Sequence, residues 1–220
     1  MRVAAASIQV RRAEKQDADF LAWVLLSSSR GHLSRGVWDL IIGADDQGCL
    51  EYLRRLTTAE PRSLCHYESF WVAETDGHPQ AALSTFRCSA GRWATVAEAQ
   101  SAVRRDLGWT EKDLEASSNR MAPLWASFLP DVGADWGIEN IATRPECRRL
   151  GLVSVLLDQA IREGRERGCK LVQTTTYIGN SAVHAALAKA GFQASDEKRS
   201  EVTLKALGTP GFVRFLRALS

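Results

Sequence analysis

The alternation of apolar and polar residues changes its period near Pro145. Residues 137–143 (GIENIAT) alternate apolar and polar side chains, which predicts a strand with two unlike faces, and Pro145 ends this pattern. After a turn at residues 146–153, apolar residues recur every three or four positions, which predicts an amphipathic helix. These apolar residues are Leu152, Val153, Leu156, Leu157, Ala160, Ile161 and Gly164. The stretch 136–168 is therefore predicted to form a strand, a turn and a helix.

Weaker patterns predict the other elements. Strands are expected at residues 7–12, 69–74, 80–86, 171–176 and 192–198, and helices at residues 18–29 and 49–56. Asp17 stands where it can cap the first of these helices, and Asp76-Gly77 is a hairpin signal, although the connection could be longer than two residues. Residues 37–42 are apolar and ambiguous, and residues 212–219 have a helical period.

Residues 92–135 predict a helical segment between the hairpin and the strand at residues 137–143. Thr95 to Glu98 has the pattern of a capping box that opens one helix, and Thr110 with Asp113 is a weaker signal for a second. Pro123 then predicts a kink or a new start, because proline lacks the backbone N–H that a helix interior needs.

Composition narrows the class of protein. The 220 residues, 45% of them apolar, fit a single globular domain. Twenty-eight basic residues against 26 acidic ones argue against a general nucleic-acid or membrane-surface binder. The five cysteines are scattered without metal-ligand spacing, so we expect no metal site and a reducing, cytoplasmic setting. No signal peptide or membrane span is predicted.

The turn before the amphipathic helix carries Arg148, Arg149 and Gly151. The first N–H groups of a helix are unpaired and lie at the positive end of its macrodipole, so such a turn can hold a phosphorylated ligand. The alternative is an ordinary solvated surface turn, because a loop with one glycine is a weak signal.

Two sequence blocks resemble the GNAT N-acetyltransferase superfamily. The acetyl-CoA-binding pattern Q/R-x-x-G-x-G/A falls on residues 148–153, with Val153 where glycine or alanine is usual. The pattern N-x-x-A-x-x-x-Y-x-K-x-G-F falls on residues 180–192, with Leu187 in place of the tyrosine and valine at the small position. The two blocks occur in the family's order, and the resemblance covers roughly the second half of the chain.

The resemblance implies an α/β protein with the GNAT fold: a mixed central sheet flanked by helices, with a helical insertion before the central strand. Residues 1–220 would form one such domain, with the insertion at about residues 92–135 beside the acceptor site or in a dimer contact, or as plain scaffold. The last segment would be a strand despite its helical period. Acetyl-CoA, as the acetyl donor, would contact Ile141, Ala142, Thr143, Arg148, Arg149, Leu150, Gly151, Leu152, Val153, Ser154 and Asn180. Asn180 also stands where it can cap the helix that follows it.

Glu139 is the candidate general base. It is the only acidic residue of the predicted central strand, and loss of hydration there would raise its pKa towards the working pH. The alternative is a glutamate that pairs with an arginine or contacts substrate. The backbone N–H of Ile141 would stabilise the thioester oxygen.

The residue that assists the leaving thiolate is less well defined, because Leu187 replaces the family's tyrosine. Tyr177, just after the strand at residues 171–176, could substitute as the acid or be part of the wall. His184 is expected at the packing edge of its helix. Trp38 and Asp39 could contact substrate, although a tryptophan in an apolar cluster is more often core.

The leading hypothesis is an acetyl-CoA-dependent N-acetyltransferase that acts on a primary amine by direct attack. The alternative is a GNAT-like module that binds acyl-CoA without turnover, which the substitutions at Val153 and Leu187 motivate. Small amines, aminoglycosides, amino acids and protein N-termini all stay open as acceptors. A homodimer is compatible with this hypothesis, and no nucleic-acid or membrane partner is expected.

Overall fold

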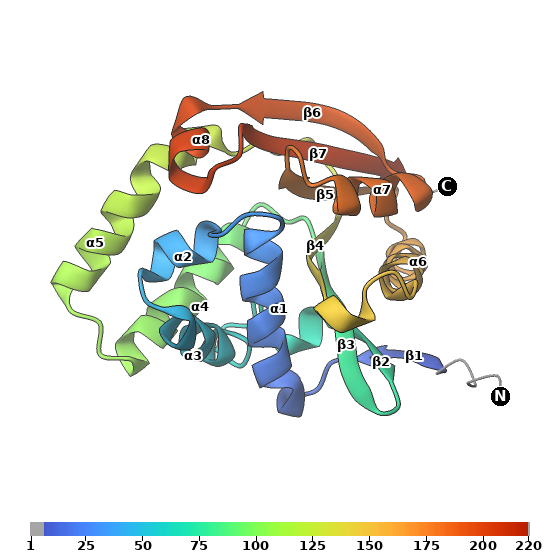
Figure 1. Cartoon of the computed structure of the whole chain (residues 1–220), viewed down its shortest axis with the longest axis horizontal. Coiled ribbons are helices and arrows are strands. Elements are labelled where there is room, and N and C mark those ends of the chain that lie inside the picture. The colour runs from blue at the N-terminus through green and yellow to red at the C-terminus, as the bar shows by residue number, and fades with distance from the viewer. Residues whose placement is uncertain (1–6, 220) are drawn as a thin grey trace.

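The computed structural model describes residues 7–219 and is built around one seven-stranded sheet (Figure 1). The strand order is β1-β2-β3-β4-β5-β7-β6, and every neighbouring pair is antiparallel except β4 and β5, which are parallel. The strands are β1 (Ile8–Arg12), β2 (Phe70–Thr75), β3 (His78–Arg87), β4 (Trp136–Thr143), β5 (Leu171–Tyr177), β6 (Gln193–Arg199) and β7 (Gly211–Ala218).

Helices cover both faces of the sheet (Figure 1). The helices are α1 (Ala18–Arg30), α2 (Val37–Ile42), α3 (Asp46–Leu56), α4 (Arg92–Asp106), α5 (Glu111–Met121), α6 (Leu152–Glu166), α7 (Ser181–Lys189) and α8 (Glu201–Leu207). Short 3-10 turns lie at Lys15–Asp17, Tyr67–Ser69, Ala122–Ser127 and Pro145–Cys147. No helix among residues 7–219 is both long and apolar enough to cross a membrane.

Alternate residues of the strands enter two separate cores. Val72 and Ala82 pack with α1, α2 and α3, whereas Ala73, Leu83 and Ile138 pack with α6 and α7. This division follows from the period of two along a strand, which turns successive side chains to opposite faces. We call these the α1 face and the α6 face of the sheet.

Most of the predicted elements are present, including the last strand. The hairpin turn has two residues, and Asp76 and Gly77 both have positive φ (52° and 74°), as a type I′ turn requires. The ambiguous residues 37–42 form helix α2. The period of residues 212–219 suggested a helix, but β7 pairs with both β5 and β6, so sheet hydrogen bonding decides its structure.

Two predicted helix caps are wrong, although α1 begins at Ala18 as expected. Asp17 precedes α1 but makes no capping bond; its carboxylate accepts hydrogen bonds from Arg11 (2.7 and 2.9 Å) and from the Glu14 amide. Burial alone would raise the pKa of Asp17, but these hydrogen bonds outweigh it and lower the pKa. Helix α4 begins at Arg92, three residues before Thr95, whose hydroxyl donates to the carbonyl of Gly91 (3.3 Å).

The predicted helical insertion packs on α2. Thr110 and Asp113 form the expected capping box of α5, and Pro123 lies in the 3-10 turn that follows. Ser117 donates to the carbonyl of Ile41 (2.6 Å), and Arg120 donates to the carbonyl of Leu40 (2.6 Å). Because these bonds use carbonyls at the end of α2, the insertion completes that helix's C-terminus.

Candidate active site

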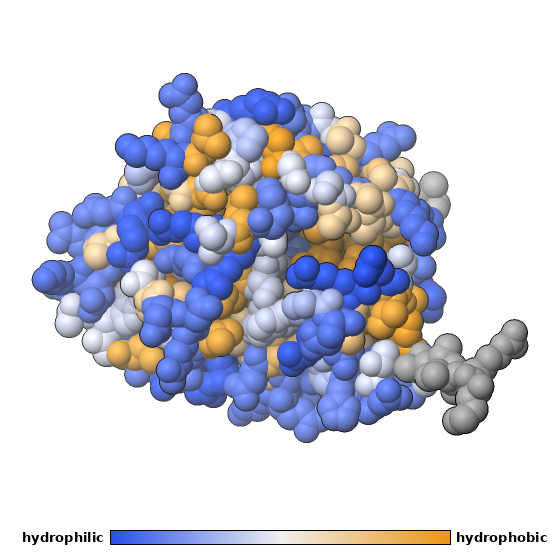
Figure 2. Space-filling model, in the orientation of Figure 1, coloured by the Kyte–Doolittle hydropathy of each residue, from blue (hydrophilic) through white to orange (hydrophobic). Residues whose placement is uncertain are grey.

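The centre of the sheet opens between β4 and β5. In the described part of the chain, these strands pair only at Trp136 with Val172 and at Gly137 with Gln173. Beyond these pairs, β4 continues to Thr143 bonded to β3 alone. The β5-facing edge of β4 thus presents backbone N–H and C=O groups to the opening, and such groups need partners. Figure 2 shows a hollow between α1 and α7 with apolar side chains at its base.

A β-bulge in β4 shapes this opening. Ser84 of β3 lies opposite Glu139 and Ala82 lies opposite Ala142, so β4 has one extra residue over this stretch. Asn140 takes a positive φ of 56° at the bulge, and its side-chain amide donates to the Ser84 hydroxyl (2.9 Å). The bulge therefore turns the strand at the residue after the candidate base and reorients the edge that faces β5.

Glu139 lies on the α1 face. Its neighbour Ile138 is in the core of the α6 face, so the alternation along β4 points Glu139 the other way. Burial raises the pKa of Glu139 to about 8, and the Thr175 amide, Arg92 and Arg214 oppose a further rise. A carboxyl group with this pKa is only partly ionised near neutral pH, and its ionised fraction, which grows as the pH rises, can accept a proton.

Arg92 and Arg214, which the sequence reasoning missed, lie near this carboxyl group. Arg214 is 3% exposed and pairs with Thr175 across β5 and β7, which places it in the same row of the sheet as Glu139. Its guanidinium contacts Asp196 (3.2 Å) and the Pro130 carbonyl. The sequence signal for a special role of Arg214 was its position as the single arginine within the apolar residues 212–216. Only the pairing register of β7 with β5 shows that its side chain faces Glu139.

The turn before α6 has the geometry of a phosphate cradle. Gly151 is the N-cap residue of α6, with a φ of 83°, and α6 has no side-chain cap, so its first N–H groups lack a side-chain partner. Arg148, Arg149 and Leu150 are exposed beside it. A Cβ atom at Gly151 would meet nothing within 4 Å, so the surface above the turn is open.

The other predicted donor contacts lie along the same path. Ile141, Ala142 and Thr143 form the end of β4, and the Thr143 hydroxyl is buried without a partner among the described residues. Leu152 is buried in the core of the α6 face, and Val153 packs against that core. The side chain of Val153 is thereby directed towards the protein interior. Ser154 follows in the first turn of α6 and is half-buried.

Asn180 was expected to cap α7, but its side chain makes no capping bond. Asn180 is the N-cap residue by position and is 7% exposed, and its amide donates to the Thr176 hydroxyl (3.4 Å). The side chain of Asn180 also lies against Gly31 of the α1–α2 loop, where a Cβ atom would be 3.1 Å from the Asn180 amide nitrogen.

Tyr177 is fixed in the wall of the opening. Its hydroxyl donates to the Ser29 carbonyl (2.6 Å), and burial raises its pKa. His184 makes a hydrogen bond with the Tyr177 carbonyl (3.0 Å), in agreement with the expected packing role. Leu187 is 0% exposed in the core of the α6 face.

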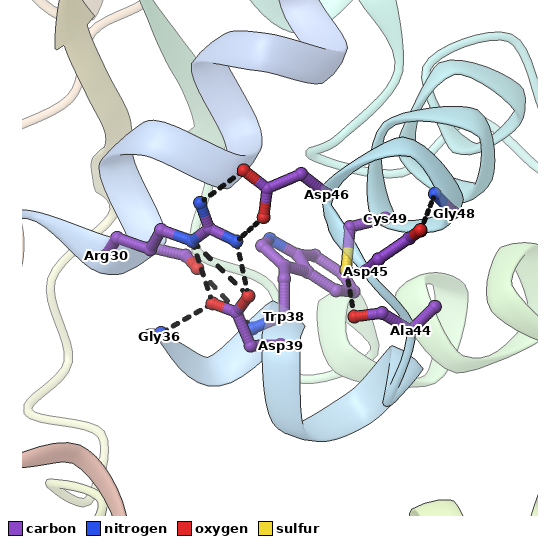
Figure 3. A network of polar contacts seen from close by, with 10 residues as sticks. Arg30, Gly36, Trp38, Asp39, Ala44, Asp45, Asp46, Gly48 and Cys49 are labelled. Atoms are coloured by element: carbon purple, nitrogen blue, oxygen red, sulfur yellow. Dashed lines mark hydrogen bonds and ion pairs between the residues drawn. The ribbon is translucent and has the colours of Figure 1, made fainter. Parts of the chain in front are cut away.

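Trp38 and Asp39 serve the structure of the α1–α2 region (Figure 3). Trp38 is 8% exposed and belongs to the α1-face core. Asp39 accepts hydrogen bonds from Arg30 (2.6 Å) and from the Gly36 amide (2.6 Å), and Arg30 also binds Asp46 (2.6 Å). Arg30 therefore ties the end of α1 to the starts of α2 and α3.

An opened parallel strand pair, a helix N-terminus flanked by arginines and the half-buried carboxyl group of Glu139 lie along β4 and α6, an arrangement that suits a long phosphorylated donor. A model of the acetyltransferase (GNAT) family matches residues 44–192, more than half of the chain. The chain belongs to this family, and the expected α/β fold with a mixed sheet is confirmed.

Solved structures agree with this fold at low sequence identity. The chain is similar to an acetyltransferase crystal structure (TM-score 0.68, 15% identity, 96% of this chain and 100% of the other). It is also similar to an N-acetyltransferase from Staphylococcus aureus (TM-score 0.63, 13% identity, 95% and 100%). A third similar structure is the polyamine N-acetyltransferase of Drosophila melanogaster, which forms N-acetylagmatine (TM-score 0.56, 15% identity, 96% and 100%). No curated protein matches the sequence significantly.

Family membership makes the chain an acyltransferase with acetyl-CoA as its donor. The residues present fit that donor. The open edge of β4 offers backbone partners for the pantetheine amides, and the α6 turn offers N–H groups and arginines for the phosphates.

Proposed function

We propose that this protein is an N-acetyltransferase that moves the acetyl group of acetyl-CoA to a primary amine by direct attack. The observation that carries the proposal is the position of Glu139: a carboxyl group with a pKa of about 8 beside the opening between β4 and β5. Acyl transfer to an amine needs a proton acceptor that is partly ionised at the working pH.

In the proposed reaction, the amine nitrogen attacks the thioester carbonyl carbon while Glu139, directly or through a water, takes the proton that the nitrogen loses. The Ile141 N–H, at the edge of β4 after the bulge, donates to the carbonyl oxygen as it gains negative charge. The carbon–sulfur bond then breaks, and the products are an N-acetylated amine and the thiol of coenzyme A.

The proposed departure of the thiolate needs no protein acid. An ordinary thiol has a pKa of about 8.5, so the thiolate is a tolerable leaving group that water can protonate. Tyr177 is the residue proposed for assistance, but its hydroxyl could act only after leaving the Ser29 carbonyl. Leu187 has no proton to give. We therefore favour unassisted or water-assisted departure.

The experiment measures thiol release from acetyl-CoA with a panel of amines, beside calorimetric binding of acetyl-CoA. We expect at least one amine class to give thiol release in step with an N-acetylated product found by mass spectrometry. Binding of acetyl-CoA without acetylation of any amine would favour the alternative, an acyl-CoA-binding module that lacks the acid at Leu187.

The acceptor is proposed to be a small-molecule or peptide amine. Five free cysteines support the proposal of a reducing, cytoplasmic setting. The exposed side chains of Trp125 (65%) and Leu204 (53%), on adjoining elements, support the proposal of a homodimer contact. Residues 1–220 are proposed to act as one domain, in which the insertion at about residues 92–135 completes the α1 face.

A further inference from the structure

Five aromatic rings form a continuous row on the α1 face of the sheet. The rings come from the segment after α5, from β7, from β5 and from the α1–α2 loop. In order, the centroids of Trp125, Phe128, Phe212, Tyr177 and His32 are 5.8, 5.1, 5.3 and 6.4 Å apart. These distances are typical of rings that pack against one another. We call these five residues the aromatic row.

The aromatic row reaches the proposed transfer site through β5. Tyr177, in the wall of the opening, pairs with Phe212, and Thr175 pairs with Arg214 two residues earlier on the same face. The Thr175 amide is the backbone group that approaches the Glu139 carboxyl group. Two residues of a strand span about 7 Å, so the row begins about that far from the strand position that Glu139 contacts.

Phe128 brings the row to the same side of the sheet as the candidate base. Two residues after Phe128, the Pro130 carbonyl accepts a hydrogen bond from Arg214. Arg214 lies near the Glu139 carboxyl group. The segment that begins at Phe128 therefore borders the surroundings of the base, and the Phe128 ring lies where this segment meets the row.

The aromatic row has a fixed interior and an accessible outer part. Tyr177 and Phe212 are each 6% exposed, and the Tyr177 hydroxyl donates to the Ser29 carbonyl (2.6 Å), so packing and hydrogen bonding hold these rings. Phe128 is half-buried, and Trp125 is 65% exposed. A ligand that covers the free part of Phe128 would bury apolar surface against a ring whose neighbours are already in place.

The charges beside the row disfavour an acceptor with a second cationic group. The Lys198 ammonium group donates to the Phe128 carbonyl (3.3 Å), which places a positive charge next to the row. Two carboxylates on adjoining segments already have arginine partners, since Asp131 pairs with Arg92 and Asp196 with Arg214. Like charges repel, so the second charge of a polyamine would be unfavourable beside Lys198.

We propose that the acceptor is a small monoamine that carries an aromatic ring on a short carbon chain. This inference rests on the proposed function and names the substrate class of the same site. The amine loses its proton to Glu139, its nitrogen forms the bond to the acetyl carbon, and coenzyme A leaves as the thiol. The ring of the acceptor lies on Phe128, where ring contacts add to the burial of apolar area.

The test compares 2-phenylethylamine with n-propylamine and agmatine in two assays of the full chain. One assay is thiol release from acetyl-CoA. The other is calorimetric binding of each amine to the protein saturated with coenzyme A, which needs no turnover. We expect 2-phenylethylamine to exceed both other amines about tenfold or more in kcat/KM and in affinity.

The two assays separate failure of this inference from failure of the proposed function. Binding of 2-phenylethylamine with the expected preference but without thiol release would support the aromatic site and contradict the proposed transfer. Acetylation of n-propylamine or agmatine as efficient as that of 2-phenylethylamine would keep the transfer and overturn the aromatic acceptor. Equal affinities of the three amines would overturn it as well.

Phe128→Leu tests the ring directly, because leucine keeps an apolar side chain without the aromatic one. It should lower the affinity for 2-phenylethylamine about two- to tenfold and change that for n-propylamine little. Trp109→Leu is the matched control: Trp109 is also half-buried against the α1-face core, but its ring packs on Tyr52, outside the row. It should leave both affinities unchanged. With both variants folded by circular dichroism, equal losses in the two, or no loss in Phe128→Leu, would overturn the proposal.

Discussion

Glu139→Gln is the substitution that examines the proposed chemistry most closely. Glutamine keeps the shape of the side chain but cannot take a proton. General base catalysis contributes about 100-fold to 10,000-fold, so kcat/KM should fall by an amount in that range. The affinity for acetyl-CoA should change little, because the donor contacts are proposed to lie on β4 backbone and the α6 turn.

The pH dependence follows from the raised pKa of Glu139. With a pKa of about 8, roughly one carboxyl group in eleven is ionised at pH 7 and about ten in eleven at pH 9. The rate ratio of wild type to Glu139→Gln should therefore rise roughly tenfold between these pH values. Taking the ratio at each pH removes the titration of the amine, which is the same for both proteins.

The same pKa predicts how stability changes with pH. Because folding raises the pKa of Glu139 from 4.5 to about 8, the folded state holds the proton more tightly than the unfolded state. This stabilising effect is complete below pH 4.5 and is lost as the pH rises to about 8. Relative to its value at acid pH, the free energy of unfolding should decrease by at most about 5 kcal/mol through this group.

Urea unfolding at pH 5 and pH 9 measures this effect. Glu139→Gln should lose less stability than wild type between the two pH values, whereas Glu115→Gln, at an exposed position on α5, should follow wild type. Full activity of Glu139→Gln across the pH range with a confirmed acceptor would refute the base assignment. A pH dependence of stability equal to that of wild type would refute the raised pKa itself.

Three further substitutions test the surroundings of the opening. Gly151→Asp should weaken acetyl-CoA binding in calorimetry, because it places an anion at the cradle. The control is Gly151→Ala, which adds the same backbone strain without a charge. Equal affinities of the two variants would locate the phosphates elsewhere. Leu187→Tyr restores the family's usual residue, but the larger side chain must fit a position that is 0% exposed. We therefore expect a lower melting temperature, which corresponds to about 1–3 kcal/mol of destabilisation, and no gain in kcat. Tyr177→Phe removes the hydrogen bond to the Ser29 carbonyl and should lower the free energy of unfolding by about 1 kcal/mol in thermal unfolding. It should reduce kcat less than tenfold. A larger fall in kcat with unchanged acetyl-CoA binding would make Tyr177 the acid.

Much of the fold could be predicted because its signals are local. The alternation of residues 137–143, the Asp76-Gly77 turn and the period of α6 depend on neighbours within a few residues. The six residues of α2 were ambiguous because a short apolar run fits a buried helix and a strand equally well. Its conformation depends on Arg30 and Arg120, which come from other helices.

The parts of the site that could not be predicted depend on contacts between distant segments. Asp17 and Asn180 were expected to cap helices, but Arg11 and Thr176 engage their side chains instead. Arg214 approaches Glu139 only because β7 inserts between β5 and β6, and nothing in the local sequence fixes that order. The sequence therefore predicted a candidate base, Glu139, without the arginines that limit its pKa.

A crystal structure of the complex with acetyl-CoA tests the central claim most directly. The account predicts that the pyrophosphate lies on the N–H groups of residues 151–154 and that the pantetheine arm follows the free edge of β4. The thioester oxygen should lie within hydrogen-bonding distance of the Ile141 N–H, on the side of the opening that Glu139 borders. A donor bound outside the opening between β4 and β5, or a thioester out of reach of Glu139 even through one water, would contradict the account.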